Sequence, residues 1–266
     1  MSRESHEYST INVERRDDGV AILTLNRPEA LHALNSVMAT ELVRQFSDWV
    51  VDTQLRCIVF TATGTRAFCV GADLKERNRL DDEGIRRQHA LFRLFLTIRQ
   101  SLEVPVIAAV QGVALGGGAE IALASDIVLA AEEAEFGLPE IGLGIMPGLG
   151  GTQFLPRIIG RGRALELMLT GDRINAEEAR ECGIVSRILP RTDLLNHALE
   201  SAAQIASMPP LAVRSIRRAV QVGSELDLNS GLAYELALHQ RLMASEDRAE
   251  GVRAFVEKRP PTWRGR

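Results

Sequence analysis

Cysteine is scarce in this sequence, and its few cysteines have the spacing of neither a disulfide framework nor a metal site. Cys57, Cys69 and Cys182 are spread through 266 residues, and their number is odd. We therefore interpret them as small core residues of a protein in a reducing compartment. The sequence also lacks a metal-ligand cluster and a dinucleotide-binding glycine fingerprint between a strand and a helix. It thus predicts activity without a metal or a separate cofactor.

Positive charge is not in excess either. The chain has 31 basic and 35 acidic side chains, a formal net charge of −4, which argues against a basic field that recruits nucleic acid or an anionic membrane. No uninterrupted apolar run reaches the roughly 20 residues that span a bilayer. The first ten residues carry neither the apolar core of a secretion signal nor an arginine-rich presequence. These features predict a cytoplasmic protein with no nucleic-acid or membrane partner.

What the sequence does have is the composition of a globular protein. It is 45% hydrophobic and 25% charged, which is enough to build a sizeable core. Apolar runs at 57–60 and 106–110 are typical of strands buried on both faces, and the amphipathic segments between them predict helices. This alternation favours an α/β layered core. Helical spacing dominates after Gly160, which indicates a helical subdomain after an α/β core. We expect the core at 1–200 and the helical subdomain at 201–266.

One glycine-rich stretch, residues 104–159, combines the features that suggest chemistry. Glu120 follows a glycine triplet, and Glu140 stands in a Leu-Pro-Glu segment shortly before a second glycine cluster at 148–151. Apolar surroundings raise the pKa of a carboxyl group, which suits proton transfer near neutral pH. Glycine turns expose backbone N–H groups to a ligand oxygen. Either glutamate alone could be a surface or helix-terminal residue, but the pair suggests chemistry next to a carbonyl.

Three motifs resemble the crotonase superfamily of enoyl-CoA hydratases and isomerases. They are AFCVGADLKE at 67–76, AxxGxxxGGGxE at 109–120 and FGLPEIGLGIMPGxGGT at 136–152. The resemblance extends from about residue 13 to about residue 259. It implies a core of repeated ββα units wound as a spiral, and a C-terminal helical subdomain that forms a homotrimer or, as a dimer of trimers, a homohexamer. The sequence itself shows no clear internal repeat, so the spiral is implied by the resemblance alone.

The resemblance also implies roles for individual residues in the hydration of a 2-enoyl-CoA thioester. Glu120 would activate water, and Glu140 would protonate C2 of the substrate. The amides of Ala72 and Gly117 would hold the thioester oxygen, and the amide of Gly148 would hold the attacking water. Coenzyme A contacts are expected at Ala30, Leu31, Asp73, Leu74 and Lys75, and at Lys258, which could reach a neighbouring subunit's nucleotide or simply close a helix.

Other functions stay open at this point. Retention of both glutamates favours hydration over double-bond isomerisation, because isomerases of the family commonly lose one carboxylate. The segments FCVGADLKER and FVEKRPP look like the methylglutaconyl-CoA hydratase branch of leucine breakdown, which has been linked to RNA binding through a basic helix. The matching segment here carries Arg44 and Arg56 against Asp48 and Asp52. No basic stripe forms, so RNA binding is disfavoured.

Residues outside the three motifs also bear on the predicted function. The five histidines lie outside the three motifs, which argues against a histidine-based triad. His32 and Phe154 replace the asparagine and arginine common in the family, and we interpret both as structural variation. The polar segment 77–87 is expected to line the mouth of the pocket.

Overall fold

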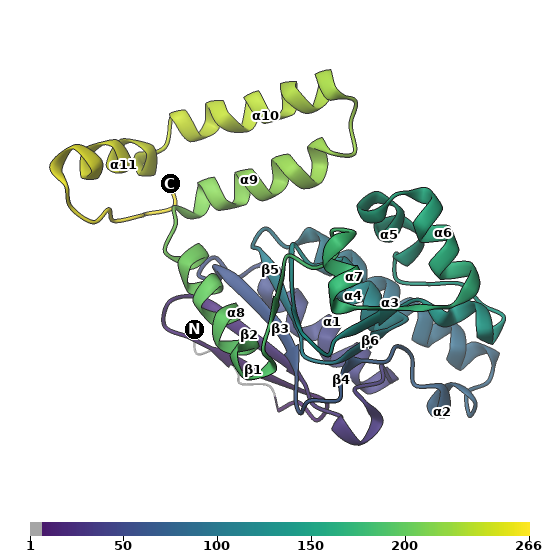
Figure 1. The fold of residues 1–266 in the computed structure, drawn as a ribbon. Coiled ribbons are helices and arrows are strands. Elements are labelled where there is room, and N and C mark those ends of the chain that lie inside the picture. Colours follow the sequence, from purple (N-terminus) through teal and green to yellow (C-terminus); the bar gives the residue numbers. More distant parts are fainter. Residues whose placement is uncertain (1–6) are drawn as a thin grey trace.

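The computed structural model describes residues 7–266 and places the apolar runs in two sheets (Figure 1). Two neighbouring pairs, the first two strands of the larger sheet and the last two of the smaller, are antiparallel, and all other neighbours are parallel. The six-stranded sheet has the order β1 (Ile11–Arg15), β2 (Val20–Leu25), β3 (Cys57–Ala62), β5 (Val106–Val110), β7 (Ile127–Ala131) and β10 (Arg187–Leu189). The four-stranded sheet has the order β4 (Ala67–Cys69), β6 (Val113–Leu115), β8 (Glu135–Gly137) and β9 (Arg173–Asn175).

Helices connect and cover these sheets. In the first half of the chain they are η1 (Pro28–Ala30), α1 (Ser36–Val50), α2 (Leu74–Arg77), α3 (Asp82–Ser101), α4 (Gly117–Leu123) and η2 (Pro139–Leu143). In the second half they are α5 (Gly151–Ile159), α6 (Arg161–Thr170), α7 (Ala176–Glu181), α8 (Arg191–Ala206), α9 (Pro210–Gly223), α10 (Leu228–Met243) and α11 (Glu246–Glu257). The helices predicted after Gly160 are therefore present.

Successive strand pairs alternate between the two sheets. In the pairs β3–β4, β5–β6 and β7–β8, the first strand joins the large sheet and the second joins the small one. A helical segment follows each pair, so the chain winds through repeated ββα units and confirms the expected spiral. The repeat is hard to see in the sequence because β4, β6 and β8 are only three residues long, too short for a periodic pattern.

The central strand β3 shows how the core is built. All six of its residues are buried, as the continuous apolar run predicts. Because side chains alternate along a strand, Cys57 and Val59 pack on one face in the cluster that includes α8 residues, and Ile58 and Phe60 pack on the other in the larger cluster with α1. Both cysteines of the sheets, Cys57 and Cys69, are buried core residues.

The sequence predicts a cap at Asn35 or Ser36 for α1, followed by one apolar face of Val37, Leu42, Val43, Phe46 and Val50, and the structure confirms this face only in part. Asn35 caps the helix, because its side-chain oxygen accepts the backbone N–H of the third helical residue at 2.8 Å. Leu42 and Phe46 are buried as predicted, but Val37 and Val50 are 47% and 41% exposed. The helix therefore turns a somewhat different face to the core than the valines suggest.

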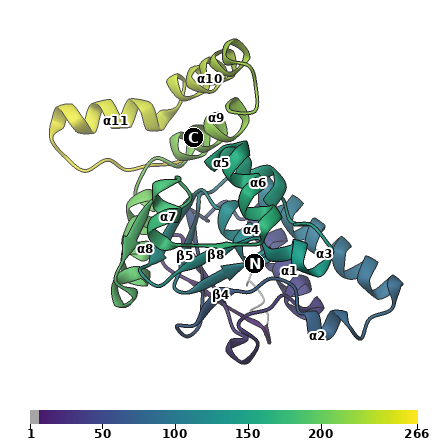
Figure 2. The same ribbon diagram turned by 45° about the vertical axis from the view of Figure 1, so that its right-hand side comes forward.

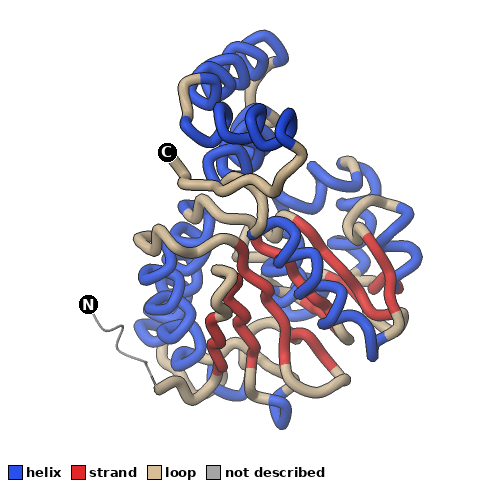
Figure 3. The backbone as a smooth tube through the Cα atoms, turned by 90° about the vertical axis from the view of Figure 1, so that its left-hand side faces the viewer, coloured by secondary structure: helices blue, strands red, loops and turns tan. Residues whose placement is uncertain are grey.

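The last three helices stand apart from the sheets. Helix α8 lies against the large sheet, and α9, α10 and α11 extend beyond it (Figures 1 and 2). The C-terminal segment, a loop in Figure 3, returns to the start of α9, where the indole of Trp263 donates to the carbonyl of Ser207 at 2.8 Å. Residue 200, where we divide the chain, falls inside α8, whose buried side chains Leu194, Ala198 and Ala202 pack on the sheet. The division into two domains stays a prediction.

Candidate active site

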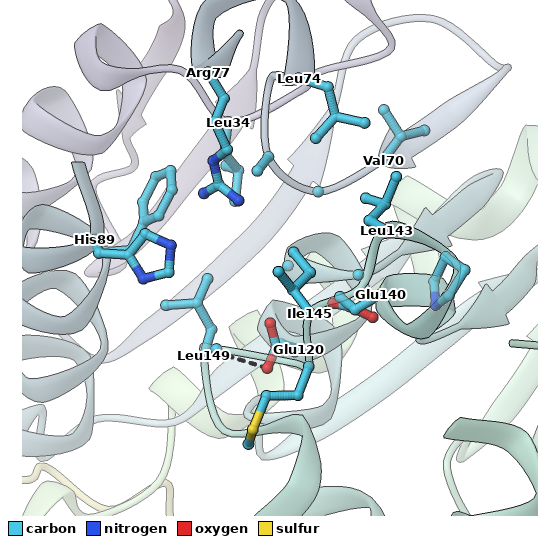
Figure 4. A pocket seen from close by; sticks show the side chains of 18 residues that line it. Leu34, Val70, Leu74, Arg77, His89, Glu120, Glu140, Leu143, Ile145 and Leu149 are labelled. Atoms are coloured by element: carbon cyan, nitrogen blue, oxygen red, sulfur yellow. Dashed lines mark hydrogen bonds between the residues drawn. The ribbon is translucent and has the colours of Figure 1, made fainter. Parts of the chain in front are cut away.

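The three motifs converge on one pocket with a volume of about 110 Å³. Its motif residues follow β4, β6 and β8 in the chain, close to the helical segments that come after these strands, and Figure 4 shows the side chains that line it. Six of the predicted site residues line it: Ala72, Leu74, Gly117, Glu120, Glu140 and Gly148. The other lining residues are Leu34, Val70, Gly71, Arg77, His89, Phe92, Gly116, Pro139, Leu143, Ile145, Met146 and Leu149.

Two backbone amides are held close together on one wall. Gly71 has a φ of 85°, and a Cβ atom there would lie 3.1 Å from the nitrogen of Gly117, so only glycine permits this approach. Leu34 fixes the loop, since its N–H donates to Gly71 at 2.7 Å and its carbonyl accepts from Asp73 at 2.9 Å. The Ala72 N–H between them has no hydrogen-bond partner among residues 7–266. Gly117 is the first residue of α4, and the first N–H groups of a helix have no hydrogen-bond acceptor within that helix.

Glu120 is a buried carboxylate in the first turn of α4. It is only 2% exposed, and its Oε1 accepts the N–H groups of Leu149 and Gly151, both at 2.7 Å. Burial raises the pKa of Glu120 to about 7, with the amides of Gly151 and Leu149 opposing the rise and the charge of Glu140 adding to it. The group can therefore exchange a proton near neutral pH.

Glu140 extends from η2 next to Glu120 (Figure 4). Its Oε2 is buried and has no hydrogen-bond partner in the described part of the chain. Burial raises the pKa of this carboxyl group as well. Gly116 leaves room for it, since a Cβ atom there would lie 3.0 Å from Glu140 Oε1. A buried carboxyl oxygen without a partner, facing a cavity, is available to a ligand.

The expected coenzyme A residues, Leu74 aside, lie outside the pocket lining. Asp73 has a structural role, because it caps α2 and pairs with Arg27 at 2.9 Å. Lys75 is exposed on α2, and Ala30 and Leu31 belong to the η1 turn. Lys258 is exposed and closes α11 in the left-handed conformation, with φ 53°. Whether any of them contacts coenzyme A stays a prediction.

Sequence analysis missed several residues of the pocket. Arg77 follows the first motif directly, but was assigned only to the mouth of the pocket within a polar segment. His89 and Phe92 are three residues apart on α3, a spacing that places them on one helix face and could have been noticed. The bonds from Leu149 and Gly151 to Glu120 could not have been found, because they join residues 29 and 31 positions apart in the chain.

Two other features are absent from residues 7–266. No group of three or more histidine, cysteine or acidic side chains is arranged to hold a metal ion there. In the same residues, no helix combines the length and the apolar character needed to cross a membrane. Helix α1, which covers much of the segment considered for RNA binding, carries Arg44 as its one basic side chain.

The sequence profile of the enoyl-CoA hydratase/isomerase family matches residues 15–266. The chain belongs to this family. It is 44% identical to a Bacillus subtilis protein described as an enoyl-CoA hydratase/isomerase, over 94% of this chain and 96% of that one. It is 42% identical to the 2,3-dehydroadipyl-CoA hydratase of Escherichia coli, over 94% and 97% of the two chains.

Solved structures of the family have the same fold. The enoyl-CoA hydratase of Bacillus anthracis superposes with a TM-score of 0.94 at 41% identity, covering 97% of this chain and all of the other. The crotonase-like α/β architecture inferred from the motifs is therefore confirmed. Membership of the enoyl-CoA hydratase/isomerase family makes an acyl-CoA thioester the substrate class of this enzyme.

Proposed function

We propose that this protein is an enoyl-CoA hydratase that adds water reversibly across the 2,3 double bond of a 2-enoyl-CoA thioester. One observation carries the proposal. Two carboxyl groups with raised pKa values, Glu120 and Glu140, lie side by side in one pocket with the free amides of Ala72 and Gly117. Hydration needs a base for water, an acid for C2 and donors for the thioester oxygen, and this set supplies each of them.

In the proposed reaction the thioester oxygen accepts the N–H groups of Ala72 and Gly117. Deprotonated Glu120 takes a proton from water, whose oxygen bonds to C3 while the double-bond electrons move toward the thioester oxygen. The two amides stabilise this enolate, a type of interaction that is worth about 10²–10³ in rate per donor. Glu140 then donates a proton to C2 and completes the hydroxyacyl product. Gly148 borders Glu120 in the pocket, where its amide would hold the water.

The assay that tests this proposal follows the absorbance of the enoyl thioester. Crotonyl-CoA should lose this absorbance as water adds. Isomerisation is the alternative activity, and a 3-enoyl-CoA substrate should gain the absorbance if the enzyme shifts double bonds. The presence of both carboxylates in the pocket favours hydration. Activity on the 3-enoyl substrate with none on crotonyl-CoA would replace hydratase by isomerase.

The raised pKa of Glu120 predicts a pH dependence for hydration. Water activation needs the deprotonated carboxylate, so kcat/KM should rise with pH and level off above about pH 7. For a single ionisation at this pKa, the rate at pH 6 should be about tenfold below the plateau. Initial rates from pH 5 to 9 check this, and a flat profile below pH 7 would contradict it.

The proposal includes assembly into a trimer or a dimer of trimers. The last three helices expose an unusual number of large apolar side chains, which commonly marks an interface. They include Ile216, Val220, Leu228, Leu232, Leu236, Met243, Val252, Phe255 and Val256, with Phe255 84% exposed.

Light scattering should therefore give a mass three or six times the 29.2 kDa of one chain. Phe255→Glu should weaken the assembly, because a carboxylate would replace an apolar contact. Val51→Glu is the control, since Val51 is 78% exposed and directly follows α1, outside the last three helices. A monomeric wild type at micromolar concentration would contradict the proposal.

Chelation tests the expectation that no metal takes part. The proposed steps use two carboxyl groups and two amides, so hydration should be unchanged after incubation with EDTA. Loss of turnover that a divalent ion restores would show that a metal is needed.

Cytoplasmic location and the lack of a nucleic-acid partner also stay predictions from the sequence.

A further inference from the structure

Arg77 places a cation in a pocket that is otherwise largely apolar. It is the last residue of α2 and is half-buried. Figure 4 shows its guanidinium and the imidazole of His89 on the side of the pocket away from Glu120 and Glu140. The proposed reaction uses neither group. Apolar side chains make up much of the remaining wall: Leu34, Val70, Leu74, Phe92, Leu143, Ile145, Met146 and Leu149.

A buried amide holds the guanidinium in place. Arg77 donates through Nε and Nη2 to Gln88 Oε1, both at 3.3 Å. Gln88 is only 1% exposed and donates in turn to Glu76 Oε2 at 2.6 Å. Glu76 Oε2 also accepts the backbone N–H of Ser36 at 2.9 Å. Glu76, whose charge acts on Arg77, is thus engaged by Gln88 and Ser36, and Arg77 is oriented by a neutral partner.

Within residues 7–266, most of the hydrogen-bond donors of Arg77 have no partner. An arginine has five N–H donors, and Gln88 takes two of them. Among residues 7–266 no carboxylate forms an ion pair with Arg77, and Glu76 is the one nearby charge that favours its ionised form. Burial lowers the pKa of Arg77, and burial and the charge of Arg77 together lower the pKa of His89. A half-buried cation without a counter-ion is costly, and an anionic ligand group would remove that cost.

We infer that Arg77 is a specificity-determining residue that binds a carboxylate on the acyl chain, so that the preferred substrate is an enoyl thioester with a free acid group remote from the thioester. A guanidinium binds a carboxylate through two parallel hydrogen bonds, which an alkyl chain cannot offer. His89, neutral at the rim, would contribute a further donor. Methylglutaconyl-CoA, the alternative raised by the sequence, has such a carboxylate.

The phosphates of coenzyme A are the other possible source of an anion. The acyl carboxylate is favoured because Arg77 lines the same pocket as Glu120 and Glu140, where the acyl group reacts. The residues expected to meet coenzyme A at the nucleotide end, such as Ala30 and Lys75, lie outside that lining. A phosphate contact would serve every acyl-CoA equally, whereas a carboxylate contact would distinguish between them.

Calorimetric binding of two saturated analogues, glutaryl-CoA and butyryl-CoA, tests this inference without turnover. Wild type should bind glutaryl-CoA more tightly. Arg77→Met should weaken glutaryl-CoA binding by about 10- to 100-fold, the range for a charge-assisted hydrogen-bonded pair, and change butyryl-CoA binding by less than about threefold. Arg77→Lys should recover part of the loss. Arg79→Met is the matched control, because Arg79 is exposed two residues further on and does not line the pocket.

Equal weakening of both ligands by Arg77→Met would overturn the inference, because Arg77 would then bind coenzyme A or support the fold. No weakening of either would overturn it as well. Retained butyryl-CoA affinity shows that the variant is folded. The inference rests on the proposed function for the identity of the reaction, and the two fail separately. An enzyme that hydrates neither crotonyl-CoA nor glutaconyl-CoA refutes the hydratase proposal, while the binding contrast still decides the role of Arg77.

Discussion

Replacing Glu140 with glutamine is expected to abolish most hydration of crotonyl-CoA. Glutamine keeps the shape of the side chain but cannot donate the proton that C2 needs, and general acid catalysis contributes about 10²–10⁴-fold. The exchange of a C2 proton of butyryl-CoA with solvent should collapse with it, because that reaction uses the group nearest C2. Absorbance measures the rate of hydration, and proton NMR in D₂O measures the rate of C2 exchange.

Glu120→Gln is the matched variant that separates the two carboxylates. Hydration should fall by a similar factor, since water is no longer activated, but part of the C2 exchange should remain. Binding of butyryl-CoA should barely change in either variant, because the amides of Ala72 and Gly117 are backbone groups. Near-wild-type hydration by Glu140→Gln would show that Glu140 is structural and that the mechanism is wrong.

The stability of the Glu120→Gln variant gives a second test. Burial raises the pKa of Glu120 from 4.5 to about 7, so ionising it in the folded state costs stability as pH rises through that window. Below pH 4.5 the group is protonated in both states and the cost vanishes. Glu120→Gln should therefore raise the free energy of unfolding at pH 8, by about 1–3 kcal/mol, while it lowers activity. Gain of stability with loss of turnover would be typical of a functional buried charge.

Gly118→Ala is expected to damage both the fold and the site. A Cβ atom at Gly118 would lie 2.0 Å from the carbonyl oxygen of Cys69, so α4 and β4 would have to separate. That contact positions Gly117 against the loop that holds Ala72. Because the clash is with backbone, we expect the free energy of unfolding to fall by about 3 kcal/mol or more, with kcat/KM at least about tenfold lower.

Gly162→Ala is the control for this substitution. Gly162 lies in α6 with nothing within 4 Å of an added Cβ atom, so alanine should be neutral or stabilise the protein by roughly 0.5–1 kcal/mol. Denaturant unfolding and crotonyl-CoA hydration measure both effects. Wild-type stability and turnover in Gly118→Ala would mean that the close packing of α4 on β4 is unimportant.

The sequence predicts the elements with strong local signals. The run of buried residues in β3, the cap at Asn35 and the helices after Gly160 all follow from periodicity and capping. Three-residue strands such as β4 and β6 have no such signal, and their pairing joins distant segments. The ββα spiral could therefore be anticipated only from the family resemblance.

The sequence likewise predicts only part of the site. Glu120, Glu140 and the glycines around them could be picked out because carboxylates among apolar residues and glycines are unusual. Their exact environment could not, since the amides that bond Glu120 come from a loop folded back from beyond Glu140. Arg77 and His89 enter the pocket through the packing of α2 and α3. The spacing of His89 and Phe92 indicates a shared helix face, but it does not show what that face lies against.

The stereochemistry of hydration tests the central claim most directly. Glu120 and Glu140 lie side by side on one wall of the pocket (Figure 4), so the hydroxyl group and the C2 proton should reach the same face of the planar enoyl thioester. Crotonyl-CoA hydrated in D₂O should therefore give a product with one deuterium at C2, added syn to the C3 hydroxyl group, as read by NMR. Anti addition, or a mixture of the two, would contradict the assignment of both steps to this pair of carboxylates.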